Sequence, residues 1–391
     1  MIRREATRRI QLMARARPVI TVAGPRHAGK TTLVRAIFPY HKYVNLGISD
    51  VREFAEKDPA GFLRFHTGYT GLIIEDYLRV PKLSHHIREA VEKNRRRAGR
   101  FILTTSHLPI KTGPCGQPLR HPSTQILLPP SIRELGFAKI SLERDEYIYR
   151  GFMPRVHSEK TDPRAIHTNY TTFYVKHDIK NIIEMDDQAA FWRLLKLLAG
   201  RVGQIINTAA IAEDAGISQS TLERWISALE ESFIIFKLPA YPASFGKKVS
   251  RVPKLYFTDV GMAAALLKIT SAEQVFRDPL VGNLFENMVV ADALKCRYNT
   301  GQGADIFYYR SPNGIEIDMV VSRGRYIMPI EIKSTPQYNA SFTKNIKLFS
   351  RLSKRIKYGY VVYSGETRER AGEPGFVNFK NIGALVAEWE G

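Results

Sequence analysis

A glycine-rich stretch near the start of the chain has the residue types and spacing that bind phosphate. An apolar run, residues 19–23, precedes it, and a helical pattern begins at Lys30. In such a loop, backbone N–H groups and the positive end of the following helix surround phosphate oxygens. Lys30 is expected to reach the β- and γ-phosphates of ATP, and the Thr31 hydroxyl is expected to bind Mg²⁺. The predicted nucleotide-binding residues are Gly24, Pro25, Arg26, His27, Ala28, Gly29, Lys30, Thr31 and Thr32.

Hydrolysis of a bound ATP also needs carboxylates at the end of a second buried strand. The apolar residues 72–74 are followed by Glu75 and Asp76, which we predict to be catalytic acids, with Glu75 also a Mg²⁺ ligand. Ser106 follows another apolar run, residues 101–105, and is the third predicted catalytic residue because its hydroxyl can sense the γ-phosphate. A simple polar cap at the end of that strand is the alternative for Ser106.

A second group of acids lies in the C-terminal third of the chain. Glu331 and Lys333 are two residues apart on a predicted strand, so their side chains share one face. Asp318 ends a neighbouring strand-like run, and Glu286 lies on the preceding predicted helix. Three carboxylates can hold Mg²⁺, while Lys333 positions a water for attack on a phosphodiester. From the strand pattern alone, a solvated surface strand is the better explanation, because this short motif is common.

Elements that would position these residues are visible as alternating patterns. In the first ~150 residues, short apolar runs alternate with helical stretches, as in a parallel sheet covered by helices. This predicts an α/β fold with the phosphate loop after the first strand. The predicted strands are residues 19–23, 43–46, 71–74, 101–105 and 125–128, and the predicted helices include 30–38 and 83–96.

The middle of the chain is mostly helical and contains a helix-turn-helix pattern. Two short helices in residues 207–229 meet at Gly216, and the strand-like residues 233–238 are predicted to form a wing. The second helix offers Arg224 to DNA but also carries Glu223. A winged-helix module that packs between domains is therefore an equally good interpretation.

Several stretches together resemble one group of prokaryotic AAA-type ATPases. They are residues 24–32, 52–59, 99–104, 250–259, 284–287, 316–320 and 329–334. The family joins its ATPase to a helix-turn-helix and to a C-terminal domain of unknown function related to restriction-type nucleases. With the patterns above, this resemblance predicts a P-loop ATPase domain over 1–152, a helical and winged-helix region over 153–240, and a nuclease-like α/β domain over 241–391. It also implies a homo-oligomer.

This chain departs from the family at the predicted catalytic acids. The family usually has Asp-Glu where this chain has Glu75 and Asp76, and Leu78 replaces a family Gln. Adjacent strand residues point to opposite sides, so each carboxylate is misplaced for its role. A displacement of about 1 Å can lower a rate roughly a hundredfold. We therefore predict a DNA-associated ATPase with impaired hydrolysis, or alternatively a nucleotide-dependent binding switch or assembly protein with little catalysis.

Composition indicates the kind of partner and compartment. The 58 Lys and Arg against 38 Asp and Glu give a net charge of +20, which favours nucleic acid, here DNA, over basic faces that only aid solubility. The basic runs 93–97 and 344–357 are the better candidates for phosphate contact. No apolar run is long enough to cross a membrane, and Cys115 and Cys296 form no disulfide framework, so we expect a cytoplasmic protein. The Arg-rich residues 1–17 are predicted to be a first helix rather than a transit peptide.

Overall fold

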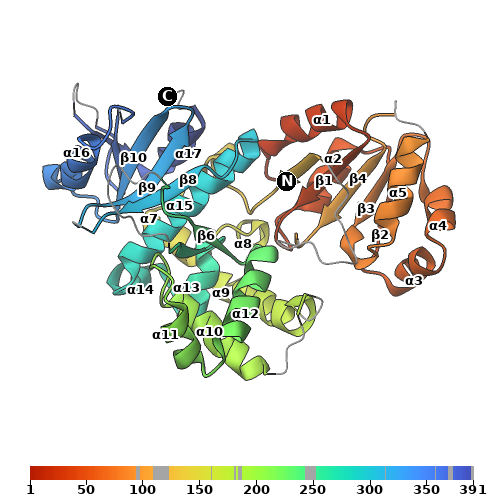
Figure 1. Cartoon of the computed structure of the whole chain (residues 1–391), viewed down its shortest axis with the longest axis horizontal. Helices are drawn as coiled ribbons and strands as arrows, with labels where there is room; N and C mark the ends of the chain where they lie inside the picture. Colours follow the sequence, from red (N-terminus) through yellow and green to blue (C-terminus); the bar gives the residue numbers. More distant parts are fainter. Residues whose placement is uncertain are drawn as a thin grey trace.

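The chain forms three connected parts in the computed structural model (Figure 1). A parallel sheet with its helices makes up the N-terminal part, a group of helices the middle part, and a second sheet the C-terminal part. The structure describes residues 1–391 except 94–96, 109–122, 160, 180–181, 184–186, 243–251, 313, 357, 369–372 and 389–391.

The N-terminal part confirms the predicted parallel α/β sheet. Its five strands lie in the order β2-β3-β4-β1-β5, and all neighbours are parallel. Apolar residues on both faces pack under helices, which is why these runs are continuous rather than alternating. The strands are β1 (Val19–Ala23), β2 (Lys42–Asn45), β3 (Leu72–Glu75), β4 (Phe101–Thr105) and β5 (Ser123–Ile126), and the helices are α1 (Ala6–Ala16), α2 (Lys30–Ile37), α3 (Ser49–Lys57), α4 (Pro59–His66), η1 (Tyr77–Arg79) and α5 (Leu83–Glu92).

The end of β3 differs from the prediction in a way that matters for the site. Glu75 is the last strand residue, and Asp76 has a left-handed backbone with φ 53° and ψ 42°. Asp adopts this conformation more readily than most residues. The strand alternation used to orient the two acids therefore does not apply to Asp76. Helix α5 ends at Glu92 rather than at residue 96, and residues 94–96 of the basic run lie outside the described part of the chain.

In the middle part, the predicted helix pair is present. Helix α11 (Thr208–Ala215) ends at Gly216, whose left-handed φ of 68° turns the chain into α12 (Gln219–Glu231). Strand β6 (Ile235–Leu238) pairs antiparallel with β7 (Lys254–Phe257), so the pairing spans the predicted boundary at residue 240. The other helices from the end of the first sheet onward are α6 (Ile132–Phe137), α7 (Arg144–Arg150), α8 (Pro154–Ser158), α9 (Pro163–Phe173), η2 (Tyr174–Asp178), α10 (Gln188–Ala199), α13 (Val260–Leu266) and α14 (Ala272–Arg277).

A second five-stranded sheet forms the C-terminal part, in the order β12-β11-β10-β9-β8. Strands β8, β9 and β10 are antiparallel, whereas β10, β11 and β12 are parallel. After β10 and a helix, the chain forms two more strands, and a further helix is the last described element. The elements are β8 (Ile306–Arg310), β9 (Glu316–Arg323), β10 (Tyr326–Lys333), η4 (Ala340–Thr343), α16 (Lys344–Ser350), β11 (Tyr360–Tyr363), β12 (Gly375–Asn378), η5 (Phe379–Asn381) and α17 (Ile382–Glu388).

Helix α15 (Val281–Thr300) connects the three parts, and it contacts α1, β5, α7, β7, α13, β10 and α17. Its buried polar side chains bond to backbone in other parts. Asn287 bonds both backbone groups of Phe257, Asp292 accepts from the N–H of Ile132, and Lys295 donates to the carbonyl of Pro130. Because buried polar groups without partners are costly, these bonds fix how α15 sits. No helix among the described residues has the length and apolar character needed to span a bilayer.

Candidate nucleotide-binding site

The phosphate loop joins β1 to α2 and is held closely against the strand beyond it. A Cβ on Gly24 would lie 1.9 Å from the carbonyl oxygen of Leu127, so this position accepts only glycine. Gly29 has φ 92° and directly precedes Lys30, the first residue of α2. The Lys30 Nζ donates to the carbonyl oxygens of Gly24 (2.8 Å) and Pro25 (2.9 Å). Burial lowers the pKa of Lys30 to about 8.

Arg4, which precedes α1, supports this loop from behind. Its guanidinium donates to the carbonyl oxygens of Ala28 (2.8 Å) and Leu128 (2.6 Å), and lies 3.1 Å from the Glu134 carboxylate. Arg4 and Glu134 are both buried. The first residues of the chain therefore help to fix the phosphate loop, a role that the sequence pattern did not reveal.

The Mg²⁺ side of the site brings together two predicted residues. The Thr31 hydroxyl, at the start of α2, donates to one oxygen of Glu75, and the Tyr43 hydroxyl from β2 donates to the other. Thr31 and Glu75 thus lie in direct contact, as expected for two groups that would share one Mg²⁺. These two oxygen-bearing side chains fit the hard-cation chemistry of Mg²⁺, which prefers oxygen ligands. Tyr43 was not among the predicted site residues.

Asp76, in contrast, is already paired with two cations. Its Oδ2 lies 3.6 Å from Arg26 of the phosphate loop and 3.4 Å from Arg79 of η1. Arg26 also lies 2.9 Å from Asp178 at the end of η2, a single π-helical turn, and over the ring of Phe173. π-helical turns occur often at functional sites. Arg26 therefore joins the phosphate loop to β3 and to the middle part of the chain.

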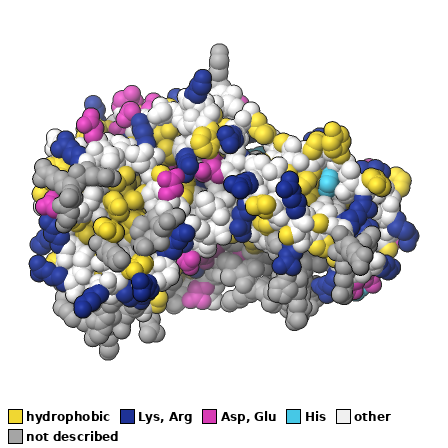
Figure 2. All heavy atoms as spheres, turned by 90° about the horizontal axis from the view of Figure 1, so that it is seen from above, with side chains coloured by type: hydrophobic (Ala, Val, Ile, Leu, Met, Phe, Trp, Pro, Cys, Tyr) yellow, Lys and Arg dark blue, Asp and Glu magenta, His cyan; other side chains and the backbone are white. Residues whose placement is uncertain are grey.

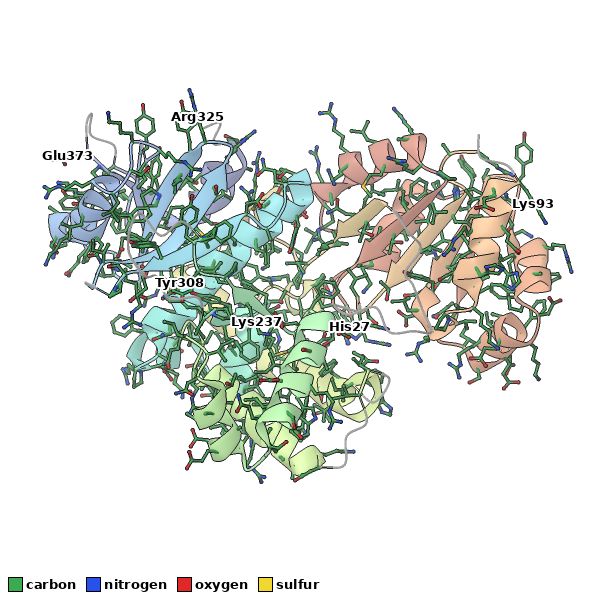
Figure 3. All side chains as sticks on the ribbon, viewed as in Figure 1. His27, Lys93, Lys237, Tyr308, Arg325 and Glu373 are labelled. Carbon is green, nitrogen blue, oxygen red and sulfur yellow. The ribbon has the colours of Figure 1, made fainter. Side chains whose placement is uncertain are left out.

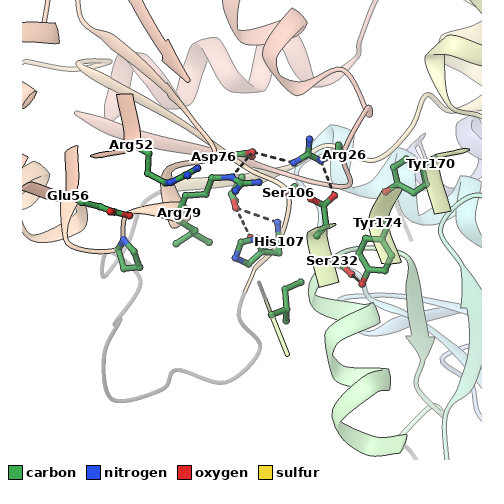
Figure 4. A pocket seen from close by; sticks show the side chains of 15 residues that line it. Arg26, Arg52, Glu56, Asp76, Arg79, Ser106, His107, Tyr170, Tyr174 and Ser232 are labelled. Atoms are coloured by element: carbon green, nitrogen blue, oxygen red, sulfur yellow. Dashed lines mark hydrogen bonds and ion pairs between the residues drawn. The ribbon is translucent and has the colours of Figure 1, made fainter. Parts of the chain in front are cut away.

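A cavity of about 450 Å³ opens beside these ion pairs (Figure 4). Ser106 and His107, which follow β4, face it together with Arg26, Asp76 and Arg79, and the middle part adds Tyr170, Tyr174, Asp178 and Ser232. Burial lowers the pKa of His107, which favours the neutral form of its ring. Next to Ser106, the backbone N–H of Leu108 donates to the Glu231 carbonyl in the last turn of α12 (2.9 Å). The segment that follows Ser106 thus contacts the end of α12.

On the other side of the phosphate loop, a mainly apolar cavity of about 360 Å³ adjoins Gly29 and Thr32. Its polar groups include His157 and Ser158, from α8. An apolar cavity with a few polar groups beside a phosphate site has the character of a nucleobase pocket. The remaining lining residues are Met1, Ile2, Arg4, Ala28, Leu33, Pro130, Ala138, Ile140 and Pro154.

The C-terminal acids converge, but each is paired with a lysine. The Lys333 Nζ lies 2.8 Å from Glu331 and 3.4 Å from Asp318, whose Oδ2 also accepts from the backbone N–H of Ile332 (2.8 Å). The buried Lys254 of β7 lies 3.1 Å from Glu286.

Lys254 also lies 3.0 Å from Glu316, and the Tyr256 hydroxyl donates to Glu286 (2.6 Å). Burial, together with the charge of Asp318, raises the pKa of Glu286 and of Glu331. Within the part of the chain that the structure describes, no three acid, His or Cys side chains are arranged to hold a metal ion. In this arrangement the lysines neutralise the carboxylates, and the metal role of Glu286, Asp318 and Glu331 stays a prediction.

The middle part presents the exposed face predicted for its second helix. Gln219, Ser220 and Arg224 are exposed on α12, whereas Leu222 and Trp225 are buried in the core. The strand β6, which follows α12, pairs antiparallel with β7, and the predicted wing stays a prediction.

The comparisons with known proteins agree with the phosphate-loop geometry. Residues 16–135 match the family model described as an AAA domain, and residues 142–273 and 281–382 match two domains of unknown function, DUF8612 and DUF4143. The chain is 27% identical over 373 residues to uncharacterized proteins of Mycobacterium bovis and Mycobacterium tuberculosis, covering 94% of this chain and 81% of each relative.

Two solved structures are among the matches. A Walker-type ATPase of Pyrococcus abyssi matches with a TM-score of 0.44 and 12% identity, over 67% of this chain and 95% of that chain. The AMPPCP-bound DnaA of Aquifex aeolicus matches with a TM-score of 0.29 and 14% identity, over 58% of this chain and 86% of that chain.

The N-terminal part is a P-loop ATPase domain of the AAA type. The C-terminal part carries the domain of unknown function DUF4143.

The Arg26–Asp178 pair yields a first prediction. Asp178→Asn keeps the shape of the side chain but removes the charge that Arg26 faces, so the free energy of unfolding should fall by about 1–3 kcal/mol. Denaturant unfolding measures this change. Glu53→Gln, which alters an exposed ion pair with Lys57, is the control and should leave stability unchanged. Equal stability of Asp178→Asn and the wild type would contradict a structural role for the pair.

Proposed function

We propose that this chain binds ATP with Mg²⁺ in the phosphate loop and uses the bound nucleotide to control contact with DNA. The observation that carries the proposal is the contact between Thr31 and Glu75 at the end of the phosphate loop. Lys30, the lysine of this loop, is buried next to Thr31. The triphosphate would lie along the loop, with Lys30 at the β- and γ-phosphates and the base in the apolar cavity beside Thr32.

Slow hydrolysis is part of this proposal. A general base must be free to accept a proton from the attacking water, and its efficiency depends on its pKa. Asp76 is engaged by two guanidinium groups, from Arg26 (3.6 Å) and Arg79 (3.4 Å), so its carboxylate is not free to orient and accept a proton from water. Ser106 lines the same cavity and would sense the γ-phosphate. We expect a turnover below about 1 s⁻¹, at the low end for enzymes. A nucleotide-dependent switch or assembly protein with little catalysis is the alternative that this pairing favours.

Control of DNA contact would run through the middle part. The segment after β4, which contains the predicted γ-phosphate sensor Ser106, bonds to the end of α12, and Arg26 of the phosphate loop bonds to η2. Two sides of the nucleotide site therefore contact that region. We propose that α11, α12 and the β6–β7 pair form a winged helix, with Gln219, Ser220 and Arg224 toward DNA. Assembly into a homo-oligomer is part of the proposal, as AAA-type ATPases tend to form rings.

ATP binding is tested by Lys30→Ala. The change deletes a charged donor to the phosphates and should weaken ATP binding by about 1.5–3 kcal/mol, roughly 10- to 150-fold in Kd. With its pKa near 8, Lys30 loses its proton in the free protein between pH 7 and 9, so wild-type affinity should fall over that range. The variant should show no such fall. Calorimetry at both pH values measures this.

Two matched variants test which carboxylate binds Mg²⁺. Glu75→Gln should reduce the gain in ATP affinity that Mg²⁺ provides, whereas Asp76→Asn should preserve it. If Lys30→Ala binds ATP as tightly as the wild type, the phosphate-loop proposal is wrong. If Lys30→Ala weakens ATP binding but Glu75→Gln leaves the effect of Mg²⁺ unchanged, only the assignment of Glu75 as the metal ligand is wrong.

We propose metal-dependent action on nucleic acid as a second candidate function, for the C-terminal part. The supporting observation is that Asp318 on β9 meets Glu331 and Lys333 on the neighbouring β10, as the resemblance to restriction-type nucleases implies. Glu286 would be a further ligand. The ion pairs of Lys254 and Lys333 oppose this candidate, because a divalent ion would have to displace an ammonium group.

Metal titration decides this second candidate. Mn²⁺ should raise the melting temperature of the wild type, and Asp318→Asn or Glu331→Gln should reduce that rise if the acids bind metal. A Mn²⁺-dependent nicking assay on the same proteins tests cleavage. Identical melting responses in all three would leave the acids as partners of the lysines only.

A further inference from the structure

A basic groove lies on the outer edge of the ATPase domain, far from the nucleotide site. The cavity has a volume of about 590 Å³ and is bounded by α4, the turn before β3, and α5. Five of its lining residues are Arg64, Tyr69, Lys93, Arg97 and Arg100; we call this cavity the outer groove. Figure 3 shows Lys93 at the opposite end of the domain from His27 of the phosphate loop.

The cations of the outer groove have no acidic partners. None of Arg64, Lys93, Arg97 and Arg100 forms an ion pair with a carboxylate of the described residues. Glu89, the carboxylate in the lining, instead contacts His85 (3.2 Å) and His86 (3.3 Å).

Arg100 is the clearest case. One terminal nitrogen of its guanidinium donates to the Ala90 carbonyl of α5 (2.8 Å), which holds the group at the groove, and burial together with the charge of Arg97 lowers its pKa. Neighbouring guanidinium groups without a carboxylate partner among the described residues favour an anion beside them. Figure 2 shows Lys and Arg side chains spread over the face that it draws.

One exposed aromatic ring lines the same groove, and two more lie in neighbouring segments. Tyr69 is 95% exposed, and the Arg97 guanidinium lies 5.6 Å from the centre of its ring. Phe65 on α4 is 70% exposed and Tyr40 is 83% exposed, and the Thr70 hydroxyl donates to the Tyr40 carbonyl, which places the Tyr40 segment beside Tyr69. Large rings are seldom left in water in such numbers within neighbouring segments.

We propose that the outer groove binds single-stranded nucleic acid, with phosphates at Arg64, Lys93, Arg97 and Arg100 and a base stacked on Tyr69. Cations that follow a backbone, together with an open aromatic face, are the two components of single-strand recognition. In a duplex the base faces are covered by their neighbours, so the exposed ring favours a single strand. The inference deepens the DNA-association part of the proposed function and is independent of ATP binding.

Fluorescence anisotropy with a labelled oligo(dT) of about 15 nucleotides tests this, using the full chain without nucleotide at low salt. Tyr69→Ala should raise Kd roughly 5- to 150-fold, the usual effect of losing one stacked base, whereas Tyr69→Phe should retain the affinity. Tyr358→Ala removes another exposed tyrosine, 65% exposed and in the C-terminal part, and should have no effect.

The salt dependence tests the phosphate contacts. Each neutralised phosphate contributes about −0.7 to the log–log salt slope for a single strand, so Lys93→Ala with Arg97→Ala should reduce the slope by roughly 1.4. Arg8→Ala with Arg15→Ala removes the same charge from the exposed side of α1, outside both basic runs, and should leave the slope unchanged.

Equal oligo(dT) affinity of Tyr69→Ala and the wild type would overturn the proposal. Tighter binding of a duplex of equal length would also overturn it. ATP affinity of Tyr69→Ala should remain that of the wild type, and Lys30→Ala should still bind oligo(dT), so failure here and failure of the ATP proposal are distinguishable.

Discussion

The guanidinium of Arg26 holds the phosphate loop between two carboxylates from different parts of the chain. Asp76 belongs to the ATPase sheet, and Asp178 belongs to the middle helices. Because Arg26 is itself a residue of the loop, any shift of the loop on binding a phosphate would change both ion pairs. The proposed control of the middle part by nucleotide depends on this constraint, and so does the account of slow hydrolysis, since the same pairing engages Asp76.

Helix α15 supplies a comparable constraint on the fold as a whole. Its 20 residues are largely buried, and its Asn287, Asp292 and Lys295 bond to backbone from β7, from α6 and from the segment before α6. Lys295 also lies 3.7 Å from the centre of the Phe152 ring. A helix with polar groups on several sides can satisfy them only when all of these segments are in place, so the packing of α15 depends on each of them.

Local pattern was sufficient to predict the first sheet and the phosphate loop. Buried parallel strands leave continuous apolar runs, and the loop needs Gly24, Gly29 and Lys30 at fixed spacing. Contacts between distant residues left no such pattern. The bonds of Arg4 to Ala28 and Leu128, of Tyr43 to Glu75, and of Arg26 to Asp178 depend on the assembled fold.

Two further features were hidden for related reasons. Strand β3 ends at Glu75, because Asp76, the second predicted acid, has a left-handed backbone. A strand pattern in the sequence does not indicate such a turn. Lys254 was visible only as part of a family motif, and its pairing with Glu286 follows from the way β7 packs against α15. Strand phase placed Glu331 and Lys333 on one face, but it gave no indication that lysines would neutralise the acids.

A crystal structure with Mg²⁺ and a non-hydrolysable ATP analogue tests the central claim most directly. The account predicts that Lys30 leaves the carbonyls of Gly24 and Pro25 for the β- and γ-phosphates, that Thr31 and Glu75 lie at the metal, and that the base occupies the apolar cavity beside Thr32. A nucleotide bound elsewhere, or a metal held by Asp76 with Glu75 still bonded to Thr31 and Tyr43, would contradict it.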